Sequence, residues 1–530
     1  MARTAAEVAM MATDRSLFEA FRDCAEVDAE TRLIISSDNH PADIDLGSLF
    51  ARGLKVGAHF QRLGIVPGDV IAVQLPNWVE WPITWIGAAF AGAVILPIVS
   101  IYGENELGFV LRESGARMLV TPAEWRNVDY VARLNAAGEL PDLRSHVVVG
   151  GTRNDNRIIA WQDIEAPIAV GDPGAVGVDD VALLVYTSGT TADPKGVQHT
   201  HRSLLSEAAS LFGVRKVMRS GAFFSPWPTG HIAGTSVMLR LLAGGVTSIV
   251  MDHWNPANAA ELIDRNKAVS FSGTPFHLNG LLDAAEKDGF DLSSLVDFQV
   301  GAAPVPPAMI ERCAAYGLET YRSYGSTEHP TITYGSAKDP LEKRLTTEGR
   351  LIAGCEMRIV DDAGQDVISG GEGEIVSRGP DLFIGYRQAE LNEAAFLPGG
   401  WYRTGDIGWV DAEGYLHITD RKKDVIIRGG ENISSREVED HLHAHAAVEE
   451  AAVVAAPDER MGEIVCAFVV TRPGAEITIA DIGTFFAERG LARQKTPERL
   501  VIVDELPRNA TGKVLKQNLR RDLKQAATAA

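Results

Sequence analysis

The sequence predicts an α/β protein with a large N-terminal domain of layered α/β sheets, a β-rich subdomain and a small, mobile α+β C-terminal domain. Three observations predict this fold class. Short apolar runs alternate with helical patterns, the pattern changes to alternating β segments near Gly349, and a charged cluster occupies residues 420–424. With 530 residues, the chain is also too long for one ordinary core, so two or more domains are expected.

The layered α/β sheets are predicted from apolar runs that end in clusters of small or polar residues. Such runs occupy residues 181–185, 247–251 and 298–300. Short buried strands that alternate with helices form layers, and ligands in such sheets bind outside the carboxyl ends of the strands. We therefore expect the loops that begin at Thr187 and Gly301 to lie at a binding edge.

Residues 83–102 could be taken for a transmembrane helix, because they are uncharged and about long enough to span a bilayer. The segment is rich in Ala and Gly, is interrupted by Pro97, and changes to β-branched residues over 94–101. This pattern favours a buried helix followed by a buried strand. We therefore predict no transmembrane segment.

The β-rich subdomain is predicted from alternating segments with turn signals after Gly349, and the small domain is predicted from the unit that follows the charged cluster. The predicted elements are strands at 357–360, 373–376 and 415–418, then a helix at 435–445, strands at 451–455 and 464–470, a helix at 479–488 and a strand at 500–503. We place the large domain at 1–420, the hinge at 421–423 and the small domain at 424–530.

The composition narrows the classes of ligand. The formal net charge of -21 argues against a nucleic-acid groove, because phosphate backbones are bound by clustered Lys and Arg. An anionic ligand must then be held locally, by backbone amides, a metal ion or a few cations. The four cysteines form no C-x-x-C pair, and the start of the chain has no sustained apolar core, so we expect a cytoplasmic protein without disulfides or a zinc site.

A candidate phosphate-binding loop reads YTSGTTADPKGV from Tyr186 to Val197 and directly follows a buried strand. Glycine lets backbone N–H groups approach an anion, hydroxyls donate hydrogen bonds, and a lysine neutralises charge. The residues concerned are Thr187, Ser188, Gly189, Thr190, Thr191 and Lys195. The loop is not a Walker loop, since no G-K-[ST] occurs in the chain. Taken alone, it could equally be a flexible surface loop.

This loop resembles the phosphate loop of the adenylate-forming superfamily, which includes acyl-CoA synthetases, peptide-synthetase adenylation domains and luciferases. Further segments follow in the family's order over nearly the whole chain. They read GAAP at 301–304, YGSTE at 324–328, YRTGD at 402–406, DRKKD at 420–424, GGEN at 429–432 and PRNATGK at 507–513. Each segment alone is weak, but their order makes coincidence a poor explanation.

The resemblance implies an ATP-dependent carboxylate–CoA ligase that uses ATP, Mg²⁺ and coenzyme A. A carboxylate attacks the α-phosphate of ATP, pyrophosphate leaves, and the acyl-adenylate then passes its acyl group to a thiol. Both half-reactions concentrate negative charge. Placed hydrogen-bond donors, a cation and Mg²⁺ are therefore expected to supply most of the rate.

The resemblance also implies how the nucleotide is held. Tyr324 stacks on adenine, and Asp406 accepts hydrogen bonds from the ribose hydroxyls. Arg421, which follows Ile418 closely, adds donors to the ribose or a phosphate. Gly301, Ala302, Ala303 and Pro304 form the opposite wall of the adenine slot. A core aromatic remains the alternative for Tyr324, and a solvated linker charge remains the alternative for Arg421.

The catalytic residues implied by the resemblance come from both predicted domains. Thr327 bonds the α-phosphate and Glu328 holds Mg²⁺, a hard cation that prefers oxygen ligands. Lys513 bridges the substrate carboxylate and the α-phosphate during adenylation. Because Lys513 serves only this step, the small domain must then move away, and Lys423 matches the hinge position.

The thiol acceptor is expected to be free CoA. The resemblance implies that Gly429 and Gly430, followed by Glu431, let the pantetheine arm pass close to the backbone; a tight turn that needs glycine is a compatible alternative. The chain ends shortly after Lys513, so no fused carrier domain is expected. A loader of a separate carrier protein is the main alternative, and a luciferase-like oxygenase and a nucleotide-binding pseudoenzyme are remote ones.

The acyl pocket is the least defined part of the prediction. By family position it involves residues 231–235 and Gly325, with the remaining members Ala303, Ser326, His329 and Pro330. His231 could also be an ordinary core histidine. Gly325 leaves room at the pocket floor, which disfavours an enzyme for acetate alone. Medium-chain, branched, alicyclic and aryl acids all stay open, and so does a homodimer.

Overall fold

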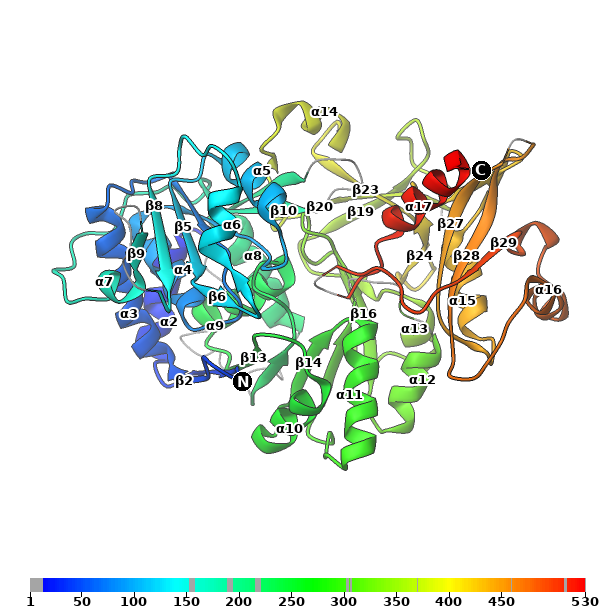
Figure 1. Ribbon diagram of the computed structural model, residues 1–530, viewed down its shortest axis with the longest axis horizontal. Helices are drawn as coiled ribbons and strands as arrows, with labels where there is room; N and C mark the ends of the chain where they lie inside the picture. The colour runs from blue at the N-terminus through cyan, green and yellow to red at the C-terminus, as the bar shows by residue number, and fades with distance from the viewer. Residues whose placement is uncertain are drawn as a thin grey trace.

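A computed structural model describes residues 13–151, 158–187, 194–214, 221–301, 305, 307–368, 370–458, 460–509 and 512–529. Figure 1 shows layered sheets and helices of the N-terminal part on one side and the small C-terminal unit on the other, with the parallel sheet of the middle part below and between them. The predicted α/β class, with a large N-terminal domain and a small C-terminal one, is confirmed.

The first sheet is mostly parallel and has eight strands in the described part of the chain. Its strands carry almost continuous apolar sequence, as in β3, because helices cover both faces of a parallel sheet. The prediction for residues 181–185 is confirmed by β10. In spatial order the strands are β21 (Gly385–Tyr386), β11 (Lys195–Thr200), β10 (Val181–Thr187), β4 (Val94–Pro97), β3 (Val70–Val73), β5 (Met118–Pro122), β8 (Ser145–Val149) and β9 (Ile158–Ala160).

The second sheet has nine strands in the described residues and is parallel from β16 to β1. Its two edges are closed by antiparallel strands. In spatial order the strands are β18 (Arg350–Leu351), β17 (Thr333–Tyr334), β16 (Thr320–Tyr324), β15 (Asp297–Val300), β14 (Ser270–Gly273), β12 (Phe223–Ser225), β13 (Ser248–Met251), β1 (Arg32–Ser36) and β2 (Ala42–Asp45). A short hairpin of β6 (Glu124–Trp125) and β7 (Val128–Asp129) stands apart.

Helices cover these two sheets, and α10, α11 and α12 flank the second one in Figure 1. Their bounds are α2 (Leu17–Val27), α3 (Leu46–Arg62), α4 (Glu80–Ala91), α5 (Glu104–Ser114), α6 (Tyr130–Ala136), α7 (Trp161–Ile164), α8 (His201–Val214), α9 (Ile232–Gly244), α10 (Pro256–Asn266), α11 (Pro275–Asp288), α12 (Pro307–Ala315) and α13 (Leu341–Thr346). Residues 83–102 form the fully buried α4 and then β4, as predicted. Within the described ranges, no helix is both long and apolar enough to cross a membrane.

The β-rich subdomain is an antiparallel sheet, as the alternating segments predict. Its strands are β19 (Glu356–Val360), β20 (Gly373–Arg378), β22 (Phe396–Leu397), β23 (Trp401–Val410) and β24 (Leu416–Arg421), with the short helices η2 (Ala389–Leu391) and α14 (Asn392–Ala395) between β21 and β22. The last of these strands ends at Arg421, the first residue of the predicted hinge.

The small unit begins with a new sheet after Asp424. It contains β25 (Ile426–Arg428), β26 (Glu431–Ile433), β27 (Val448–Asp458), β28 (Gly462–Thr471), β29 (Arg499–Ile502), α15 (Ser435–His443), η3 (Arg493–Lys495), α16 (Ile479–Glu488) and α17 (Lys516–Ala529). Its core is separate, with Ile426, Val453 and Phe486 among the buried members. In Figure 1 the segment that precedes α17 extends from this unit toward the middle of the molecule.

Polar contacts dock the small unit against the β-rich subdomain. The Arg436 guanidinium lies 2.9 Å from a carboxylate oxygen of Glu348 and also donates to the carbonyl of Ile418. The Asp420 carboxylate accepts a hydrogen bond from the backbone N–H of Ser435 at the start of α15. Charged and capping contacts therefore help to hold this arrangement at the junction.

Candidate active site

A cavity of about 1030 Å³ lies where the large domain, the β-rich subdomain and the small unit meet. Its walls include residues from β10, β11, α8, α9, the loop after β16, the segment after β24 and the segment before α17. The structure brings together in this cavity many of the residues named from the sequence. They are Thr187, Lys195, His231, Gly301, Gly325, Ser326, Thr327, Glu328, Arg421, Lys423 and Lys513.

Other named residues do not line the cavity or are not described. Tyr324 and Asp406 lie next to lining residues, and Ile418 packs against the apolar cluster that contains Tyr324. Gly429 and Gly430 form the β25–β26 turn, and Glu431 begins β26; none of these three lines the cavity. Both glycines have positive φ, 60° and 90°, as a two-residue hairpin turn of this kind requires. Ser188, Gly189, Thr190, Thr191, Ala302, Ala303 and Pro304 fall outside the described residues.

We call the part of the cavity at Thr327, Glu328 and Arg421, which the resemblance assigns to the nucleotide, the nucleotide end. Beside it, Asp406 links an aromatic ring to a cation. The Tyr324 hydroxyl donates to Oδ2 of Asp406 at 2.7 Å, and Nε of Arg421 donates to Oδ1 at 2.7 Å. The antiparallel pairing of β23 with β24 sets Asp406 directly opposite Arg421. The adjacent carboxylate raises the pKa of Arg421, and burial raises the pKa of Tyr324, so the guanidinium stays charged and the phenol stays neutral.

The loop after β16 carries Thr327 and Glu328 to the cavity wall. Its turn is closed by the backbone bond from Ser326 N–H to the carbonyl of His329, at 2.8 Å. A Cβ at Gly325 would collide with the Pro330 carbonyl, so only glycine fits there. His199, whose Nε2 lies 2.8 Å from the Thr327 carbonyl, fixes the loop from behind. The sequence YGSTE therefore folds into a rigid turn that presents a hydroxyl and a carboxylate.

Glu328 and Lys195 meet through one tyrosine. The Tyr386 hydroxyl donates to Oε1 of Glu328 at 2.7 Å, and the Lys195 ammonium lies 5.1 Å from the centre of the Tyr386 ring. The pairing of β21 with β11 brings Tyr386 to this position. Tyr386 was not predicted as a site residue, because nothing in its local sequence distinguishes it from a core tyrosine.

Three cationic residues converge at the junction of the domains: Arg421, Lys423 and Lys513. Burial and, second, the Arg421 charge lower the pKa of Lys513 to about 8. Burial also lowers the pKa of Lys423 to about 8, with the positive charges of Arg421 and Lys513 among the other causes. Grouped positive charges in a cavity favour a polyanion, because each bound phosphate relieves their mutual repulsion.

His231 lies at the boundary between the nucleotide end and the rest of the cavity. It caps α9, with its Nδ1 accepting from the Ala233 N–H at 3.2 Å, and its ring stacks on Trp227 at 5.9 Å between centroids. Burial lowers the pKa of His231 to about 4, with Lys513 as a second cause. The ring is therefore neutral at physiological pH, and because Nδ1 is an acceptor, Nε2 carries the proton.

Another part of the lining consists of Glu207, Ser236, Arg240, Thr331 and Tyr334, together with apolar side chains such as Leu211. We call it the acyl end, because the resemblance places the acyl pocket beside His231 and Pro330. The Thr331 hydroxyl donates to Oε1 of Glu207 at 2.9 Å. The sequence analysis did not name these residues. One signal was present: Arg240 is the one charged residue in a mostly apolar segment, residues 232–244, and a buried charge requires a partner or a role.

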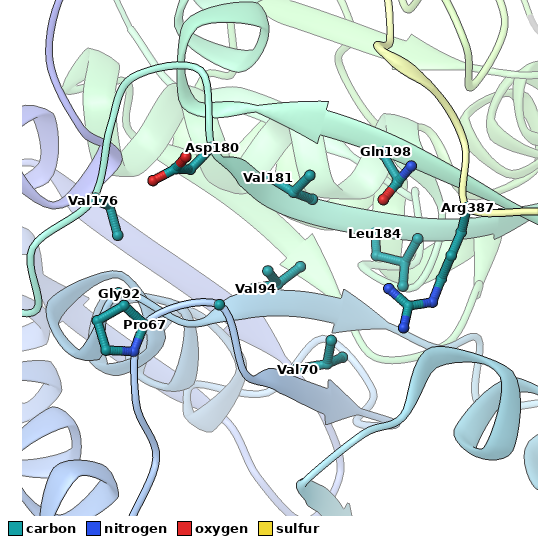
Figure 2. Close-up of a pocket in the computed structure, with 11 residues that line it drawn as sticks. Pro67, Val70, Gly92, Val94, Val176, Asp180, Val181, Leu184, Gln198 and Arg387 are labelled. Carbon is teal, nitrogen blue, oxygen red and sulfur yellow. The ribbon is translucent and has the colours of Figure 1, made fainter. Parts of the chain in front are cut away.

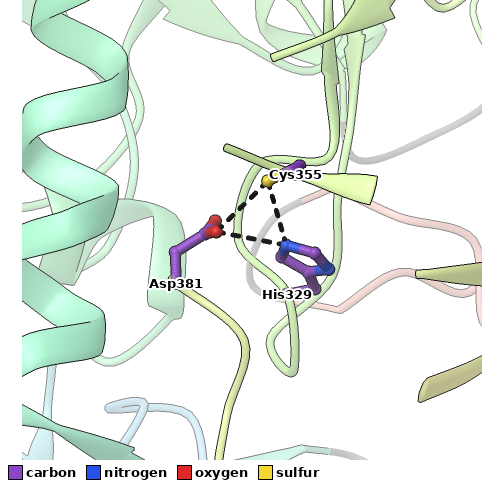
Figure 3. Close-up of side chains that lie close together, drawn as sticks. All are labelled: His329, Cys355 and Asp381. Carbon is purple, nitrogen blue, oxygen red and sulfur yellow. Dashed lines mark hydrogen bonds and ion pairs between the residues drawn. The ribbon is translucent and has the colours of Figure 1, made fainter. Parts of the chain in front are cut away.

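Behind the acyl end, Asp381 accepts hydrogen bonds from two buried side chains, as Figure 3 shows. Its Oδ1 lies 3.2 Å from Nε2 of His329 and 3.3 Å from Sγ of Cys355, which donates to it. The Ser377 hydroxyl bonds Nδ1 of His329 at 2.8 Å. These three ligand-type atoms could approach a metal ion, but hydrogen bonds alone satisfy them. His329, expected in the pocket wall, thus lies one layer behind it.

A second, smaller cavity of about 420 Å³ opens over the first sheet, near β3, β4 and β10 (Figure 2). Its floor is apolar, with Val70, Val94 and Leu184, and Asp180 and Arg387 lie toward its two ends. None of the residues named from the sequence lines it. The larger cavity is therefore the candidate active site.

The AMP-binding enzyme family matches residues 23–387, and the AMP-binding enzyme C-terminal domain matches residues 437–513. These two ranges contain Glu328 and Lys513, which the cavity brings together.

Two relatives show the extent of the likeness. The medium-chain fatty-acid–CoA ligase of Escherichia coli is 35% identical over 505 residues, which cover 93% of this chain and 88% of that ligase. A CoA ligase of Mycobacterium tuberculosis is 36% identical over 476 residues, which cover 86% of this chain and 90% of that ligase. It is named for a propanoyl group on a methyl-dioxo-octahydroindenyl ring system.

Solved structures agree with the fold. The ATP-bound MatB of Rhodopseudomonas palustris has a TM-score of 0.86 at 26% identity, with 96% of this chain and 99% of that chain covered. The anthranilate CoA ligase AuaEII, solved with anthranoyl-AMP, has a TM-score of 0.87 at 26% identity. The match covers 98% of this chain and 99% of that chain. The chain therefore belongs to the AMP-binding enzyme family within the adenylate-forming superfamily, and it is an ATP-dependent, AMP-forming carboxylate–CoA ligase.

Proposed function

We propose that the cavity performs the adenylation step with residues of both domains and that the small domain then moves to let CoA enter. One observation carries the proposal: Lys513, from the segment before α17, lies in the same cavity as Thr327 and Glu328 of the large domain. No single domain supplies this set of side chains.

In the first step, a carboxylate oxygen of the acid attacks the α-phosphorus of ATP, and the bond from that phosphorus to the bridging oxygen of pyrophosphate breaks. Lys513 lies between two anions that must come together, and its ammonium offsets their repulsion. Thr327 donates a hydrogen bond to the α-phosphate. Arg421, held by Asp406, contacts the ribose or a phosphate, and Tyr324 borders the adenine.

We assign Mg²⁺ binding to Glu328, and the carboxylate fits this role. It is 9% exposed and lines the cavity, and the Tyr386 hydroxyl is its one hydrogen-bond partner within the described part of the chain. Carboxylate and phosphate oxygens are the ligands that Mg²⁺ prefers. A bound Mg²⁺ would neutralise phosphate charge, and Lys195 together with Thr187 would contact the outer phosphates.

The second step requires a different arrangement of the domains. With Lys513 in the cavity, the turn of Gly429 and Gly430 lies away from it. We therefore propose that residues 421–423 act as the hinge between domains 1–420 and 424–530. Rotation would withdraw Lys513 and bring the glycine turn to the cavity mouth, where the thiolate of CoA attacks the acyl carbonyl and AMP leaves.

The class of acid is a separate question. The names of the relatives cover a medium-chain fatty acid and an acid with a bicyclic ring that carries two oxo groups. Both shapes require a roomy acyl site, and a cavity of about 1030 Å³ offers room beyond that of the nucleotide. We also propose a cytoplasmic location. A homodimer is the oligomeric state to test, by light scattering of the purified protein.

The experiment is pyrophosphate release from ATP with a panel of carboxylic acids, each with and without CoA, followed by mass spectrometry of the thioester. We expect acid-dependent pyrophosphate release and, with CoA, continued turnover to acyl-CoA and AMP. Acyl transfer to a carrier protein but not to CoA would contradict the proposed acceptor. ATP binding without pyrophosphate release for any acid would favour a pseudoenzyme instead.

A further inference from the structure

The acyl end of the cavity is unexpectedly polar for a site that receives a hydrocarbon chain. One face of α9 runs along it, because Ala233, Ser236 and Arg240 are spaced three and four residues apart. His231, which begins this line, is electrostatically coupled to Lys513. Arg240 follows nine residues later, which corresponds to roughly 13 Å along the helix axis. The line therefore leads from the reacting carboxylate to a buried guanidinium.

Arg240 is buried with carboxyl groups as its counter-charge. Its side chain is 8% exposed, and it is always protonated. Burial raises the pKa of Glu207 to about 8, with Asp381 as the second cause and Arg240 opposing the shift. Glu207 therefore keeps its proton at neutral pH and shares it with the carboxylate of Asp381. One positive charge on Arg240 is thus balanced by one negative charge on the Glu207–Asp381 pair.

This balance decides which acyl groups fit. A methyl end would cover the guanidinium without offering it a hydrogen bond. A second carboxylate would bring an uncompensated negative charge into a cluster that is already neutral. A neutral oxygen, in contrast, accepts a hydrogen bond from the guanidinium and adds no charge.

We propose that the acyl end binds a neutral carbonyl oxygen of the substrate on the Arg240 guanidinium, so that the acid activated is an oxo acid of medium length. The inference rests on the proposed function only in placing the reacting carboxylate beside Lys513 and His231. Arg240 then acts as a specificity residue, which contacts the far end of the acid. Glu207 acts through Arg240, and neither residue takes part in adenylation.

The first test uses the wild-type enzyme and three matched acids: octanoate, its derivative with a ketone on the penultimate carbon, and octanedioate. We expect kcat/KM for the ketone acid to exceed that for octanoate by about tenfold or more, since a hydrogen bond to a charged group is worth at least that factor. Octanedioate should be the poorest. Equal or better use of octanoate, or a preference for octanedioate, would overturn the inference.

The second test removes the guanidinium. Arg240→Met keeps a side chain of similar length, and it should reduce the preference for the ketone acid over octanoate to about one, through KM for the acid, with KM for ATP unchanged. Glu207→Gln, a neutral isostere of the protonated carboxyl, should retain the preference. Persistence of the preference in Arg240→Met would contradict the role of this residue.

Controls separate this inference from the proposed function. Arg265→Met, on the exposed face of α10, should leave the preference as in the wild type. If Arg240→Met does not fold, as judged by its thermal unfolding, the wild-type panel alone decides. Formation of octanoyl-CoA at the same rate as the ketone thioester refutes only the inference. Failure of these three acids alone also refutes only the inference, whereas failure of every acid of the panel to release pyrophosphate refutes the proposed function as well.

Discussion

The two ends of the cavity are built in different ways. At the nucleotide end, strand ends and loops from both domains bring charged groups together, with Lys513 from one side and Glu328 from the other. At the acyl end, neighbouring turns of α8 and α9 supply Glu207 and Arg240, and Asp381 supports them from behind. A domain movement can therefore dismantle the nucleotide end and leave the acyl end intact. Such a division suits an enzyme that must keep its acyl group while it exchanges its catalytic residues.

Loss of Lys513 should affect the nucleotide end most. Lys513→Ala should lower the rate of pyrophosphate release by about a thousandfold, because one placed cation at the reacting phosphate is removed. Conversion of a supplied acyl-adenylate to acyl-CoA should change by less than about twofold, since this step uses the other arrangement of the domains. Single-turnover measurements of each half-reaction test this.

The matched control is Lys287→Ala, which removes an exposed lysine of α11 and should change neither half-reaction. An equal loss of both half-reactions in Lys513→Ala would show that Lys513 is not confined to adenylation, and the contrast between the two ends would then fail.

The hinge should give the opposite pattern. Lys423→Pro restricts the backbone where the two domains join, so acyl transfer to CoA should fall by about a hundredfold while adenylation is largely retained. Because the substitution also removes a charge that lines the cavity, Lys423→Ala is the control for charge alone. If Lys423→Ala reproduces the loss in acyl transfer, the effect belongs to the ammonium and the hinge assignment is wrong.

The pH dependence should distinguish the two ends next. The pKa of Lys513 and that of Lys423 are both lowered to about 8, so both ammonium groups are charged below that pH and lose their charge above it. We expect kcat/KM for ATP to fall as the pH rises through about 8. At saturating ATP, kcat should persist to higher pH, because bound phosphates raise both pKa values.

At saturating acid this profile should be the same for every acid, since the titration of Glu207 at the acyl end affects KM for the acid and not KM for ATP. Steady-state kinetics at varied ATP, with two unrelated acids, provide the measurement. A profile that stays flat through the pKa of both lysines would contradict their depressed values.

The smallest effect is expected from a hydrogen bond at the acyl end. Thr331→Val keeps the shape of the side chain but removes the hydroxyl that donates to Glu207. KM for the acid should rise by about fivefold, and KM for ATP should not change. Thr484→Val, at an exposed position of α16, is the control. A change in KM for ATP of similar size would show that the two ends are not independent.

Sequence predicted the nucleotide end better than the acyl end for a physical reason. Thr327 and Glu328 belong to one short turn, and the Gly325 backbone fixes its shape, so the local sequence already contains the geometry. The strands and helices of the small unit follow the same logic, and α16 has the bounds predicted for it. Local patterns are sufficient where neighbours in sequence are neighbours in space.

The acyl end depends on distant residues. Glu207 and Asp381 are far apart in the chain, and they meet only because α8 packs beside the loop that precedes β21. His329 illustrates the same limit: its place next to Glu328 suggested the pocket wall, but the turn directs its ring backward to Asp381. Tyr324 was expected to stack on adenine, and the structure adds a hydroxyl bond to Asp406 that no local pattern indicated.

The shared walls of the cavity have a thermodynamic consequence. In the proposed mechanism Lys513 takes part in nucleotide binding only when the small domain is docked, so ATP affinity and domain docking are linked, and each must favour the other by the same factor. A dissociation constant measured for ATP is then the intrinsic constant divided by the docked fraction. Weakening the Arg436–Glu348 ion pair, which lies outside the cavity, should therefore weaken ATP binding without altering any group that contacts the nucleotide.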